Sequence, residues 1–378
     1  MPRGALDGLL VADFSRVLAG PLATMILGDL GAEVIKVERP DGGDDTRAWG
    51  TSYHLALNRN KRSLTLDLGD GPDRALAREL ALRADVLVES FRPGLMASWD
   101  LELDELRAVN PRLVTCSVSA FGAGASLPGY DLLAQAMAGW MSVTGEPDGP
   151  PLKVGAPLAD VICGLHAAIG ILAALRAGGG QHVDVSLMQS ALAALTNQAS
   201  AVLNEGRVPG RSGNRHPSIT PYETFAAADG ELVIACGNDA IFRSLCTALD
   251  APGLVDDQRF ATNDARCAHR GALEAELGPR LATRTVTEWV ERFRAARVPA
   301  GPVHDIEQAF AFAEGIGLAP VDVTGGVATV RPPYGLSETP ATVRLPPPAL
   351  GEHDSEIRRW LAEPRTSRPS PGGSASAA

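Results

Sequence analysis

One ionisable residue, Asp160, stands near the start of an apolar run rich in glycine and alanine, KVGAPLADVICGLHAAIGILAALRA. An unpartnered carboxylate is costly in such surroundings, so the position requires a structural partner or a chemical purpose. Because Pro157 is typical of a helix start and Asp is a common N-cap, the carboxylate is predicted to face the first-turn N–H groups, where the helix dipole keeps it ionised. Asp160 is therefore either a structural cap or a nucleophile for carbonyl carbon.

Other residues that could do chemistry are less specific. His166 lies six positions beyond Asp160, so the two do not share a helix face, and we interpret it as a core histidine with one backbone partner. Arg39 and the basic cluster NRNKRS at 58–63 are either solvated surface charges or ligands of a polyanion. Composition alone does not decide between these two roles.

Composition limits the class of protein. The chain has 378 residues, 45% hydrophobic and 21% charged, which is typical of a globular protein with a large core. Its net charge of −11 argues against general nucleic-acid binding, and five cysteines without a CxxC pair indicate neither disulfides nor a metal site. The apolar run 161–175 is too short to span a bilayer, and the first residues show no signal-like pattern. We expect a cytoplasmic protein without a membrane partner.

Apolar runs alternate with amphipathic segments in the first half of the chain. The runs are predicted strands at 9–15, 33–38, 63–68, 85–90 and 113–119, followed by a short one at 182–186. This alternation predicts an α/β fold with a parallel, Rossmann-like sheet whose ligands bind at the carboxyl ends of the strands. Helices are expected at 93–110, after Asp160, and from Leu187 to about Leu203. The glycine turns match neither GxGxxG nor a P-loop, which disfavours NAD and ATP.

A change in composition near residue 206 predicts a second folding unit. There, a hairpin turning at Asp229 and Gly230 precedes helices that begin near Ala240, Gly271 and Thr285. The expected division is a large α/β domain at 1–205 completed by about 320–362, a linker or lid at 206–224, a small α+β domain at 225–320, and a disordered tail at 363–378.

Eight motifs in one order carry a family resemblance. They are ADFSRVLAGPLATMILGDLGAEVIKVERPDGGDDTR, NRNKRSLTLDL, VLVESFRPG, PRLVTCSVSAFG, PGYDLLAQAMAG, LADVICGLHAAIGILAAL, GNRHPSITPYETF and PPALGEHDSEI. With them the chain resembles the class III CoA-transferases, the CaiB-BaiF family, from about residue 6 to residue 362. The resemblance implies a large CoA-binding domain, a smaller domain and an interlocked homodimer, and it places the family's catalytic aspartate on Asp160.

The resemblance also implies a reaction. Asp160 would attack the thioester of an acyl-CoA to form a mixed anhydride, and the released CoA thiolate would return to give an aspartyl-CoA thioester, which a small carboxylic acid resolves. CoA is then a substrate, and no tightly bound cofactor or metal is expected. Racemases of the same family pair the aspartate with a histidine where this chain has Tyr130, a poor base at neutral pH, so transferase is favoured over racemase. A non-catalytic CoA-binding protein is the third alternative.

The resemblance assigns further residues to the CoA site. They are Arg16, Val17, Leu18, Arg39, Ser90, Phe91 and Tyr130. Arg39 would hold a phosphate, because a guanidinium fork suits phosphate oxygens. Two departures weaken the expected phosphate grip: Gly69 and Ser98 stand where many relatives carry a Lys and an Arg.

The segment SGNRHPSITP at 212–221 has the Gly and Pro content of either a lid or an ordinary linker. On the resemblance, residues near the acyl intermediate would be Gly213, Asn214, Arg215, His216 and Gly237. Arg215 and His216 are the candidates for reading the carboxylate of the acceptor acid.

Overall fold

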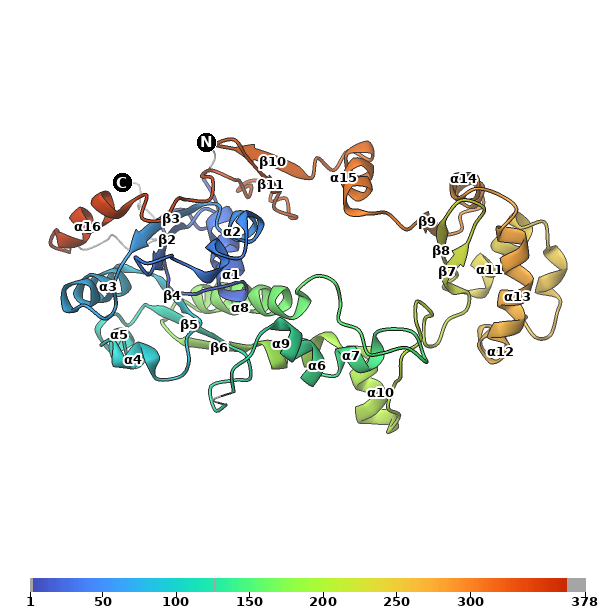
Figure 1. Ribbon diagram of the computed structural model, residues 1–378, viewed down its shortest axis with the longest axis horizontal. Helices are drawn as coiled ribbons and strands as arrows, with labels where there is room; N and C mark the ends of the chain where they lie inside the picture. Colours follow the sequence, from blue (N-terminus) through green and yellow to red (C-terminus); the bar gives the residue numbers. More distant parts are fainter. Residues whose placement is uncertain (1–2, 126, 366–378) are drawn as a thin grey trace, which may run out of the picture. The chain divides into compact units, whose positions relative to one another are not determined.

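The computed structural model describes residues 3–125 and 127–365, which form two compact units (Figure 1). The first unit is made of the described parts of Met1–Trp140, Lys153–Arg207 and Ala319–Ala378, and the second of Met141–Leu152 and Val208–Leu318. The predicted tail at 363–378 lies outside the described residues from 366 onward.

The first unit is built on a parallel sheet with the strand order β3-β2-β1-β4-β5-β6. Its strands are β1 Leu10–Asp13, β2 Glu33–Glu38, β3 Lys61–Thr65, β4 Val86–Glu89, β5 Val114–Ser119 and β6 His182–Ser186. Strands buried on both faces are rich in apolar residues, and this enrichment made the runs detectable in the sequence despite charged residues such as Lys36 and Lys61. The predicted α/β class with a parallel sheet is confirmed.

Helices cover both faces of this sheet (Figure 1). One face packs on α1 Ala19–Asp29, α8 Leu158–Ala177 and α9 Leu187–Ala194, and the other on α3 Gly71–Arg83, α5 Leu103–Val109 and α16 Asp354–Ala362. The shorter helices are η1 Asp45–Arg47, α2 Thr51–Leu57, α4 Leu95–Ser98, α6 Asp131–Met137 and α10 Asn197–Glu205, while α7 Trp140–Val143 spans the boundary with the second unit. A hairpin of β10 Val321–Thr324 and β11 Val327–Val330 completes the unit.

Two predicted helices are each divided in the structure. The helix expected from Leu187 to about Leu203 is interrupted at Thr196, whose φ of +45° cannot continue the α-helical ladder, so α9 and α10 are separate. The helix expected at 93–110 is interrupted in the same way at Asp100, with φ +60°. Neither break is marked by a Pro or Gly in the sequence.

The apolar run after Asp160 belongs to a longer helix than predicted. Helix α8 has 20 residues and a mean hydropathy of 2.0, so by length and composition alone it could cross a membrane. However, Cys163, Ala167 and Ile171 on this helix are fully buried in the core against α1 and the sheet. A core helix of an α/β unit can be as long and apolar as a membrane span. The length of 15 residues expected from the run 161–175 was therefore too short.

The second unit is an antiparallel sheet packed on helices. Strands β7 Tyr222–Ala226, β8 Glu231–Ala235 and β9 Ala300–Pro302 pair in that order. The helices are α11 Asp239–Ala248, η2 Pro252–Val255, α12 Asn263–Ala268, α13 Arg270–Leu281, α14 Val286–Ala295 and α15 Ile306–Gly315. The segment 141–152, which the sequence division kept with the large domain, belongs here because Arg211 binds the Gly149 carbonyl oxygen at 2.9 Å and the Gly213 N–H binds the Gly145 oxygen at 2.9 Å.

Candidate active site

The first turn of α8 carries Asp160 as its third residue, with Pro157 at the N-cap position. The backbone N–H groups of Ala159 and Asp160 donate to Oδ1 of Asp131, at 2.8 and 3.2 Å. Within the described residues, the Asp160 carboxylate accepts no hydrogen bond. The prediction that Asp160 caps its own helix is therefore wrong: a carboxylate from α6 takes this place because Pro157 has no side chain able to accept the N–H groups.

The electrostatic setting of Asp160 also differs from the prediction. Burial raises the pKa of the Asp160 carboxyl to about 7, and the nearby charge of Asp131 adds to this effect. The helix N-terminus was expected to keep the group fully ionised at neutral pH, but a pKa of about 7 populates both forms there. The ionised form is a more basic carboxylate than an ordinary aspartate.

Asp131 is itself held from two sides. Its Oδ2 accepts a hydrogen bond from Nε2 of the buried Gln135 at 2.6 Å, and Oε1 of Gln135 accepts from the Val154 N–H at 2.9 Å. Sequence reasoning missed both residues. The one signal for them was an Asp at a helix start with a Gln four positions later, in YDLLAQ.

His166 lies on the same helix but takes another partner. Its Nδ1 is 3.0 Å from Oγ of Ser190 on α9, so the predicted backbone partner is replaced by a hydroxyl. The side chain is half-buried in the helix packing. This placement agrees with the interpretation of His166 as a core histidine.

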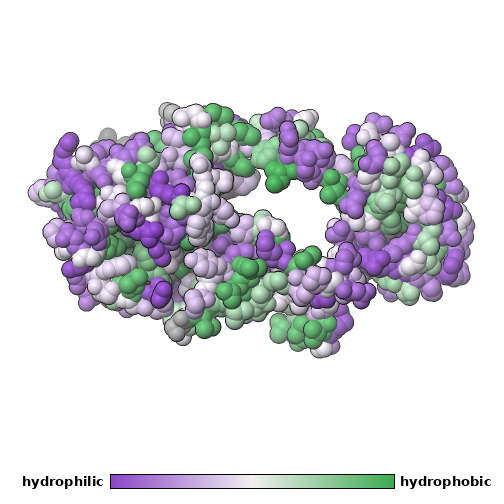
Figure 2. Space-filling model, viewed as in Figure 1, coloured by the Kyte–Doolittle hydropathy of each residue, from purple (hydrophilic) through white to green (hydrophobic). Residues whose placement is uncertain are grey.

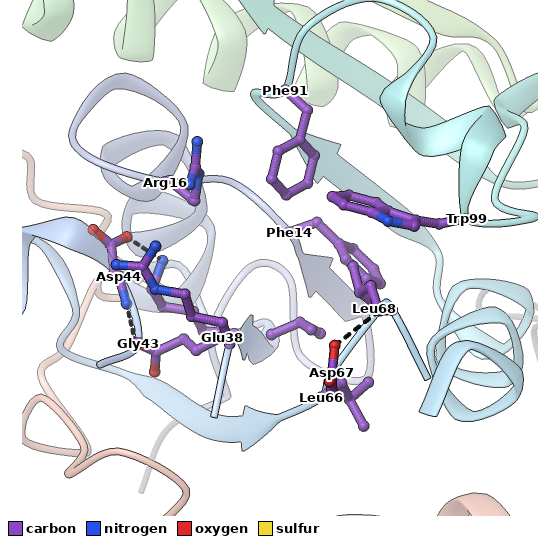
Figure 3. Close-up of a pocket in the computed structure, with 14 residues that line it drawn as sticks. Phe14, Arg16, Glu38, Gly43, Asp44, Leu66, Asp67, Leu68, Phe91 and Trp99 are labelled. Atoms are coloured by element: carbon purple, nitrogen blue, oxygen red, sulfur yellow. Dashed lines mark hydrogen bonds and ion pairs between the residues drawn. The ribbon is translucent and has the colours of Figure 1, made fainter. Parts of the chain in front are cut away.

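A cavity of about 240 Å³ opens at the carboxyl ends of the first strands (Figure 3). Its lining brings together three of the residues assigned to the CoA site, Arg16, Arg39 and Phe91, and includes Gly69, one of the two departures. The Arg16 guanidinium lies 5.4 Å from the centre of the Phe91 ring, which in turn packs edge-on against Trp99 at 5.1 Å. The site thus combines aromatic surface with cations.

Both arginines at this cavity face one acid. Nη2 of Arg39 lies 2.8 Å from Asp45 Oδ1, and Nη1 of Arg16 lies 3.7 Å from Asp45 Oδ2. The Arg39 side chain is 55% exposed. The group of Arg16, Arg39 and Asp45 keeps one net positive charge, while over the whole lining the acids Glu38, Asp44 and Asp67 balance the cations Arg16, Lys36 and Arg39.

The loop before α1 is fixed through its backbone. The Arg16 N–H donates to Ser90 Oγ at 2.9 Å, and the Val17 N–H donates to Asp44 Oδ2 at 3.2 Å. Val17 has φ +69°, a conformation that is rare for a β-branched residue and persists only when its surroundings impose it. Leu18, next in the chain, is buried. The structure therefore brings four of the assigned residues together: Arg16, Val17, Leu18 and Ser90.

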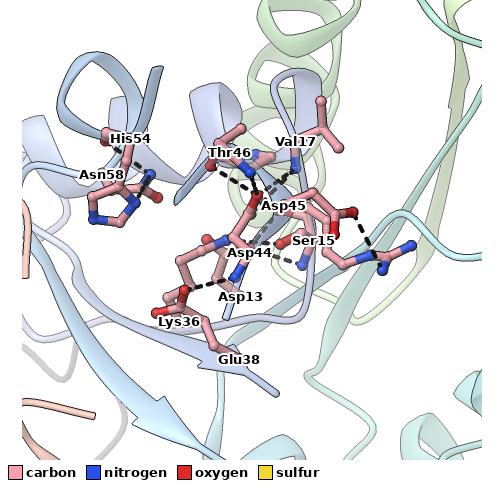
Figure 4. A network of polar contacts seen from close by, with 12 residues as sticks. Asp13, Ser15, Val17, Lys36, Glu38, Asp44, Asp45, Thr46, His54 and Asn58 are labelled. Carbon is pink, nitrogen blue, oxygen red and sulfur yellow. Dashed lines mark hydrogen bonds and ion pairs between the residues drawn. The ribbon is translucent and has the colours of Figure 1, made fainter. Parts of the chain in front are cut away.

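A buried network of charges lies beneath this loop (Figure 4). The pairs are Lys61 Nζ with Asp13 Oδ2 at 3.0 Å, Lys36 Nζ with Asp44 Oδ2 at 2.9 Å, and Arg47 Nε with Glu38 Oε1 at 2.7 Å. Burial alone would raise the pKa of Asp44, but Lys36 and the hydrogen bonds from Thr46 outweigh it and lower the pKa to about 2. Burial lowers the pKa of Lys61 to about 8, with Asp13 opposing.

The NRNKRS cluster contributes to this interior. Lys61 is fully buried, and the buried Arg59 pairs with Asp29 at 2.7 Å. Neither interpretation offered for these two residues, a solvated surface charge or a ligand of a polyanion, was right. Their partners lie about 30 to 50 positions away in the sequence, so the pairing could not be seen in it.

Tyr130 lies directly before Asp131, at the N-cap of α6, and its side chain is 58% exposed. Its ring faces Trp49 at 6.4 Å, and Trp49 packs edge-on against Tyr53 at 6.0 Å. This exposed aromatic group adjoins the residue that holds the first turn of α8. Tyr130 was predicted as a site residue from the sequence, whereas Trp49 and Tyr53 were not.

The predicted lid residues lie in the second unit. Gly213 takes φ +61°, and Nδ2 of Asn214 donates to Thr224 Oγ1 at 3.2 Å. The His216 N–H donates to the Tyr222 oxygen at 3.0 Å, so the segment runs along the edge of β7. A Cβ at Gly237 would meet no atom within 4 Å, so no close packing requires glycine there.

Arg215 is occupied by two acids. Its Nε lies 2.9 Å from Glu274 Oε1 and 3.3 Å from Glu223 Oε2. Burial raises the pKa of Glu223 to about 7, and Glu274 adds to this effect, while Arg270 and Arg215 oppose it. Arg270 also donates to the His216 oxygen at 2.8 Å. These contacts tie the predicted lid to α13.

Known proteins match this chain along nearly its whole length. The family model for CoA-transferase family III matches residues 6–354. A succinate–glutarate CoA-transferase of Agrobacterium fabrum is 42% identical over 96% of this chain and 96% of its own, and an acetyl-CoA:oxalate CoA-transferase of Acetobacter aceti is 40% identical over 96% and 97%. The crystal structure of a CAIB/BAIF family protein from Brucella suis has a TM-score of 0.87 at 40% identity, covering 95% of this chain and 100% of that one.

Proposed function

Since this chain belongs to CoA-transferase family III, we propose that it transfers CoA from an acyl-CoA to a free carboxylic acid, with Asp160 as the nucleophile. The observation that carries the proposal is the Asp160 carboxylate itself. It is partly buried at the start of α8 and, within the described residues, has neither a cation nor a hydrogen-bond donor as partner. A carboxylate placed in this way keeps its lone pairs available for attack.

The proposed reaction proceeds through acyl transfers in which the CoA thiolate stays at the site and the donor acid leaves. A carboxylate oxygen of Asp160 attacks the thioester carbonyl carbon, the C–S bond breaks, and the CoA thiolate leaves behind a mixed anhydride. The thiolate attacks Cγ of Asp160, which releases the donor acid and forms an aspartyl-CoA thioester. The acceptor carboxylate then repeats these steps in reverse order. No net proton moves, so positioning and exclusion of water matter more than acid or base strength.

CoA is proposed to lie along the cavity at the carboxyl ends of the first strands. Arg16 and Arg39 supply positive charge for its phosphates, and Phe91 supplies an aromatic face for the adenine. The backbone of Val17 and Leu18 and the Ser90 side chain shape the path towards the nucleophile. Gly69 leaves open a part of the lining that a Lys would fill with charge.

Dicarboxylic acids are the proposed substrate class. The names of both curated relatives described above include such an acid: succinate and glutarate in one, oxalate in the other. The exposed aromatic group of Trp49, Tyr53 and Tyr130, next to the residue that holds the first turn of α8, could bind the carbon chain of such an acid. A panel of two- to six-carbon diacids and matched monoacids, tested with succinyl-CoA and acetyl-CoA, would measure this preference.

The segment 212–221 is proposed to act as a lid. The contacts of Arg215 with Glu223 and Glu274 favour a revised part for this residue, in which it anchors the segment instead of reading the acceptor carboxylate. His216 then remains the candidate for the acceptor, Gly213 and Asn214 stay proposed parts of the lid, and the open space at Gly237 leaves room beside it.

A homodimer in the cytoplasm is the proposed state of the protein. Exposed apolar side chains lie on α8 at Leu165 and Ile169, the latter 62% exposed, and on α10 at Leu203, which is 81% exposed. Figure 2 shows apolar surface over α10. A second copy would cover such a surface, which a monomer rarely leaves in water.

Trapping of the covalent intermediate tests the proposal. Hydroxylamine added during turnover should form a hydroxamate on Asp160, found in the tryptic peptide 154–176. Asp160→Ala should show no adduct, and Asp148→Ala, which removes an exposed acid, should react like the wild type. An unmodified peptide in the wild type would refute the nucleophile.

One observation favours a second candidate, α-proton transfer by a racemase. A carboxyl with a pKa of about 7 is well suited to exchange a proton at neutral pH. Against it, the position of the racemase histidine holds Tyr130. Uptake of solvent deuterium at the α-carbon of an acyl-CoA, without a hydroxamate, would favour the racemase.

A further inference from the structure

We infer that Asp131 positions the nucleophile for attack and that its negative charge, added to the effect of burial, shifts the pH range in which the attack occurs. The inference rests on the proposed function of Asp160 and extends it to a residue on another helix. It concerns Asp131 as a positioning residue, since the residue acts on the substrate only through Asp160.

The first part of the inference comes from the hydrogen bonds at the start of α8. The first N–H groups of a helix have no partner within the helix, and Pro157 provides no side-chain acceptor for them. Oδ1 of Asp131 accepts two of these groups, from Ala159 at 2.8 Å and from Asp160 at 3.2 Å. Asp131 therefore binds the backbone N–H of the nucleophile, Asp160, directly.

Asp131 is fixed well enough to serve as a reference point. Gln135, fully buried one turn along α6, donates to Oδ2 at 2.6 Å, and its own oxygen accepts from Val154 in the segment that leads into α8. Hence one carboxylate and one amide connect α6, the segment before α8 and the first turn of α8. A shift of the nucleophile would break contacts on both sides of Asp131.

The second part of the inference comes from the charges around Asp160. Helix α8 packs against α1, α6, α9, β5 and β6. The ionisable groups of these elements are Asp131 on α6, Asp29 at the far end of α1, Cys116 on β5, and His182 and Asp184 on β6, while α9 has none and α8 itself adds Cys163, His166 and, in its last turn, Arg176. No cation in this set pairs with Asp160, and Asp131 is the charged neighbour that acts on it.

A charge placed in this way affects each step of the reaction. Repulsion between two carboxylates makes Asp160 more basic, and therefore a better nucleophile, but it also leaves more of it protonated below about pH 7. Once Asp160 is acylated it is neutral, and the repulsion disappears. Asp131 thereby favours the anhydride and the thioester relative to the free carboxylate.

Asp131→Asn separates position from charge. The Asn side chain keeps an oxygen that can accept from Ala159 and Asp160, but the charge is gone. The acidic limb of kcat/KM, expected near pH 7 in the wild type from the pKa of Asp160, should move down by about one pH unit. At pH 8.5, where Asp160 is ionised in both proteins, hydroxamate should form several-fold more slowly in the variant.

Two further variants complete the test. Asp131→Ala removes both the charge and the acceptor, so its limb should move as in Asp131→Asn while kcat falls further, about 10-fold or more. Asp131→Glu keeps the charge but displaces it, so the acidic limb of kcat/KM should stay near the wild-type pH while kcat falls. If Asp131→Asn does not fold, comparison of the Glu and Ala variants separates charge from position. Asp104→Asn, an exposed acid in the first turn of α5, is the matched control.

The outcomes are distinct. A residue of purely structural importance would lower the melting temperature of the variants and leave the acidic limb where it was, and this result would overturn the inference. If the wild type forms no hydroxamate on Asp160, the proposed function fails and the inference fails with it. A hydroxamate on Asp160 together with an unmoved limb in Asp131→Asn would overturn the inference alone.

Discussion

Two sets of buried acids in the first unit are treated in opposite ways. Beneath the cavity, Asp13, Glu38 and Asp44 each have a cationic partner within 3.0 Å, and the pKa of each is lowered despite burial. At the start of α8, Asp160 lies near another carboxylate, has no cation among the described residues, and its pKa is raised to about 7. Acids that are paired with cations form a rigid support, whereas an acid without a cationic partner stays reactive.

The reason lies in what each region must do during turnover. The network under Val17 must not change when a substrate binds. Buried ion pairs resist displacement because breaking one leaves a buried charge without its partner. A nucleophile must instead lose its charge in the reaction. An ion pair that stabilised the free carboxylate would have to be given up in the transition state and would slow the attack.

The largest effect is expected at the uncompensated carboxylate. Asp160→Ala should reduce CoA transfer by about 10⁴-fold or more, because the covalent route is lost. The fold should be retained, since the Asp160 side chain accepts no hydrogen bond from the described residues. Transfer rates and far-UV circular dichroism measure the two. A variant with more than a few per cent of wild-type activity would show that the nucleophile lies elsewhere.

The compensated network should respond through stability. Lys36→Met leaves Asp44 buried without its cation, and we expect a loss of about 3 to 5 kcal/mol in the free energy of unfolding. Because Asp44 also accepts the Val17 N–H, the KM for acyl-CoA should rise in any folded fraction. Denaturant unfolding is the measurement, and Lys153→Met, which removes an exposed lysine, is the control. Equal stabilities of the two variants would contradict the account of the network.

The pH dependence of stability should distinguish the two regions further. An acid whose pKa is raised in the folded state makes the protein less stable as pH rises. This loss begins near pH 4, the pKa of the acid in the unfolded chain, and continues until pH exceeds its pKa in the folded state. For Asp160, with a folded pKa of about 7, the remaining loss between pH 5.5 and 8.5 is about 2 kcal/mol, at 1.36 kcal/mol for each pKa unit. Asp160→Asn should therefore gain about this much relative to the wild type over that range. If the difference between the two proteins is constant with pH, the raised pKa is refuted.

The smallest effect is expected at the exposed rim of the cavity. Arg39→Ala should raise the KM for acyl-CoA about 3- to 10-fold with little change in kcat, because a remote charge contact is made equally in the ground and transition states. The matched reverse change, Gly69→Lys, adds a cation to the same lining and should lower the KM. A wild-type KM that does not rise with salt concentration would rule out the phosphate contact.

Much of the architecture could be predicted from the sequence. The strands were predicted because runs such as VLVE at β4 are apolar on both faces, and the matches confirm the predicted family and the CoA-transferase class of enzyme. The break at Thr196 was not predictable, since no Pro or Gly marks it. Domain boundaries, the site residues, the dimer and the compartment stay predictions.

The charge network shows why part of the site was missed. Lys36 lies in EVIKVE, where the alternation of residue types gives no sign that its ammonium group is buried, and its partner Asp44 is in a loop beyond the strand. Asp131 was missed for a related reason: a carboxylate at a helix start is predicted to cap its own helix, and here it caps another. Both depend on contacts between distant segments.

The packing of α8 on α1 has a consequence for altering this protein. A Cβ at Gly164 would lie 2.6 Å from the Ala19 oxygen, so the two helices meet backbone to backbone one turn after Asp160 and at the first residue of α1, directly after Leu18. The spacing between the loop that precedes α1 and the nucleophile is therefore set by main-chain atoms, which no rotamer change can adjust. A protein engineer can thus exchange side chains such as Trp49 or Tyr53 to suit a new acid. The separation between the loop before α1 and Asp160 stays unchanged, provided that Gly164 is kept.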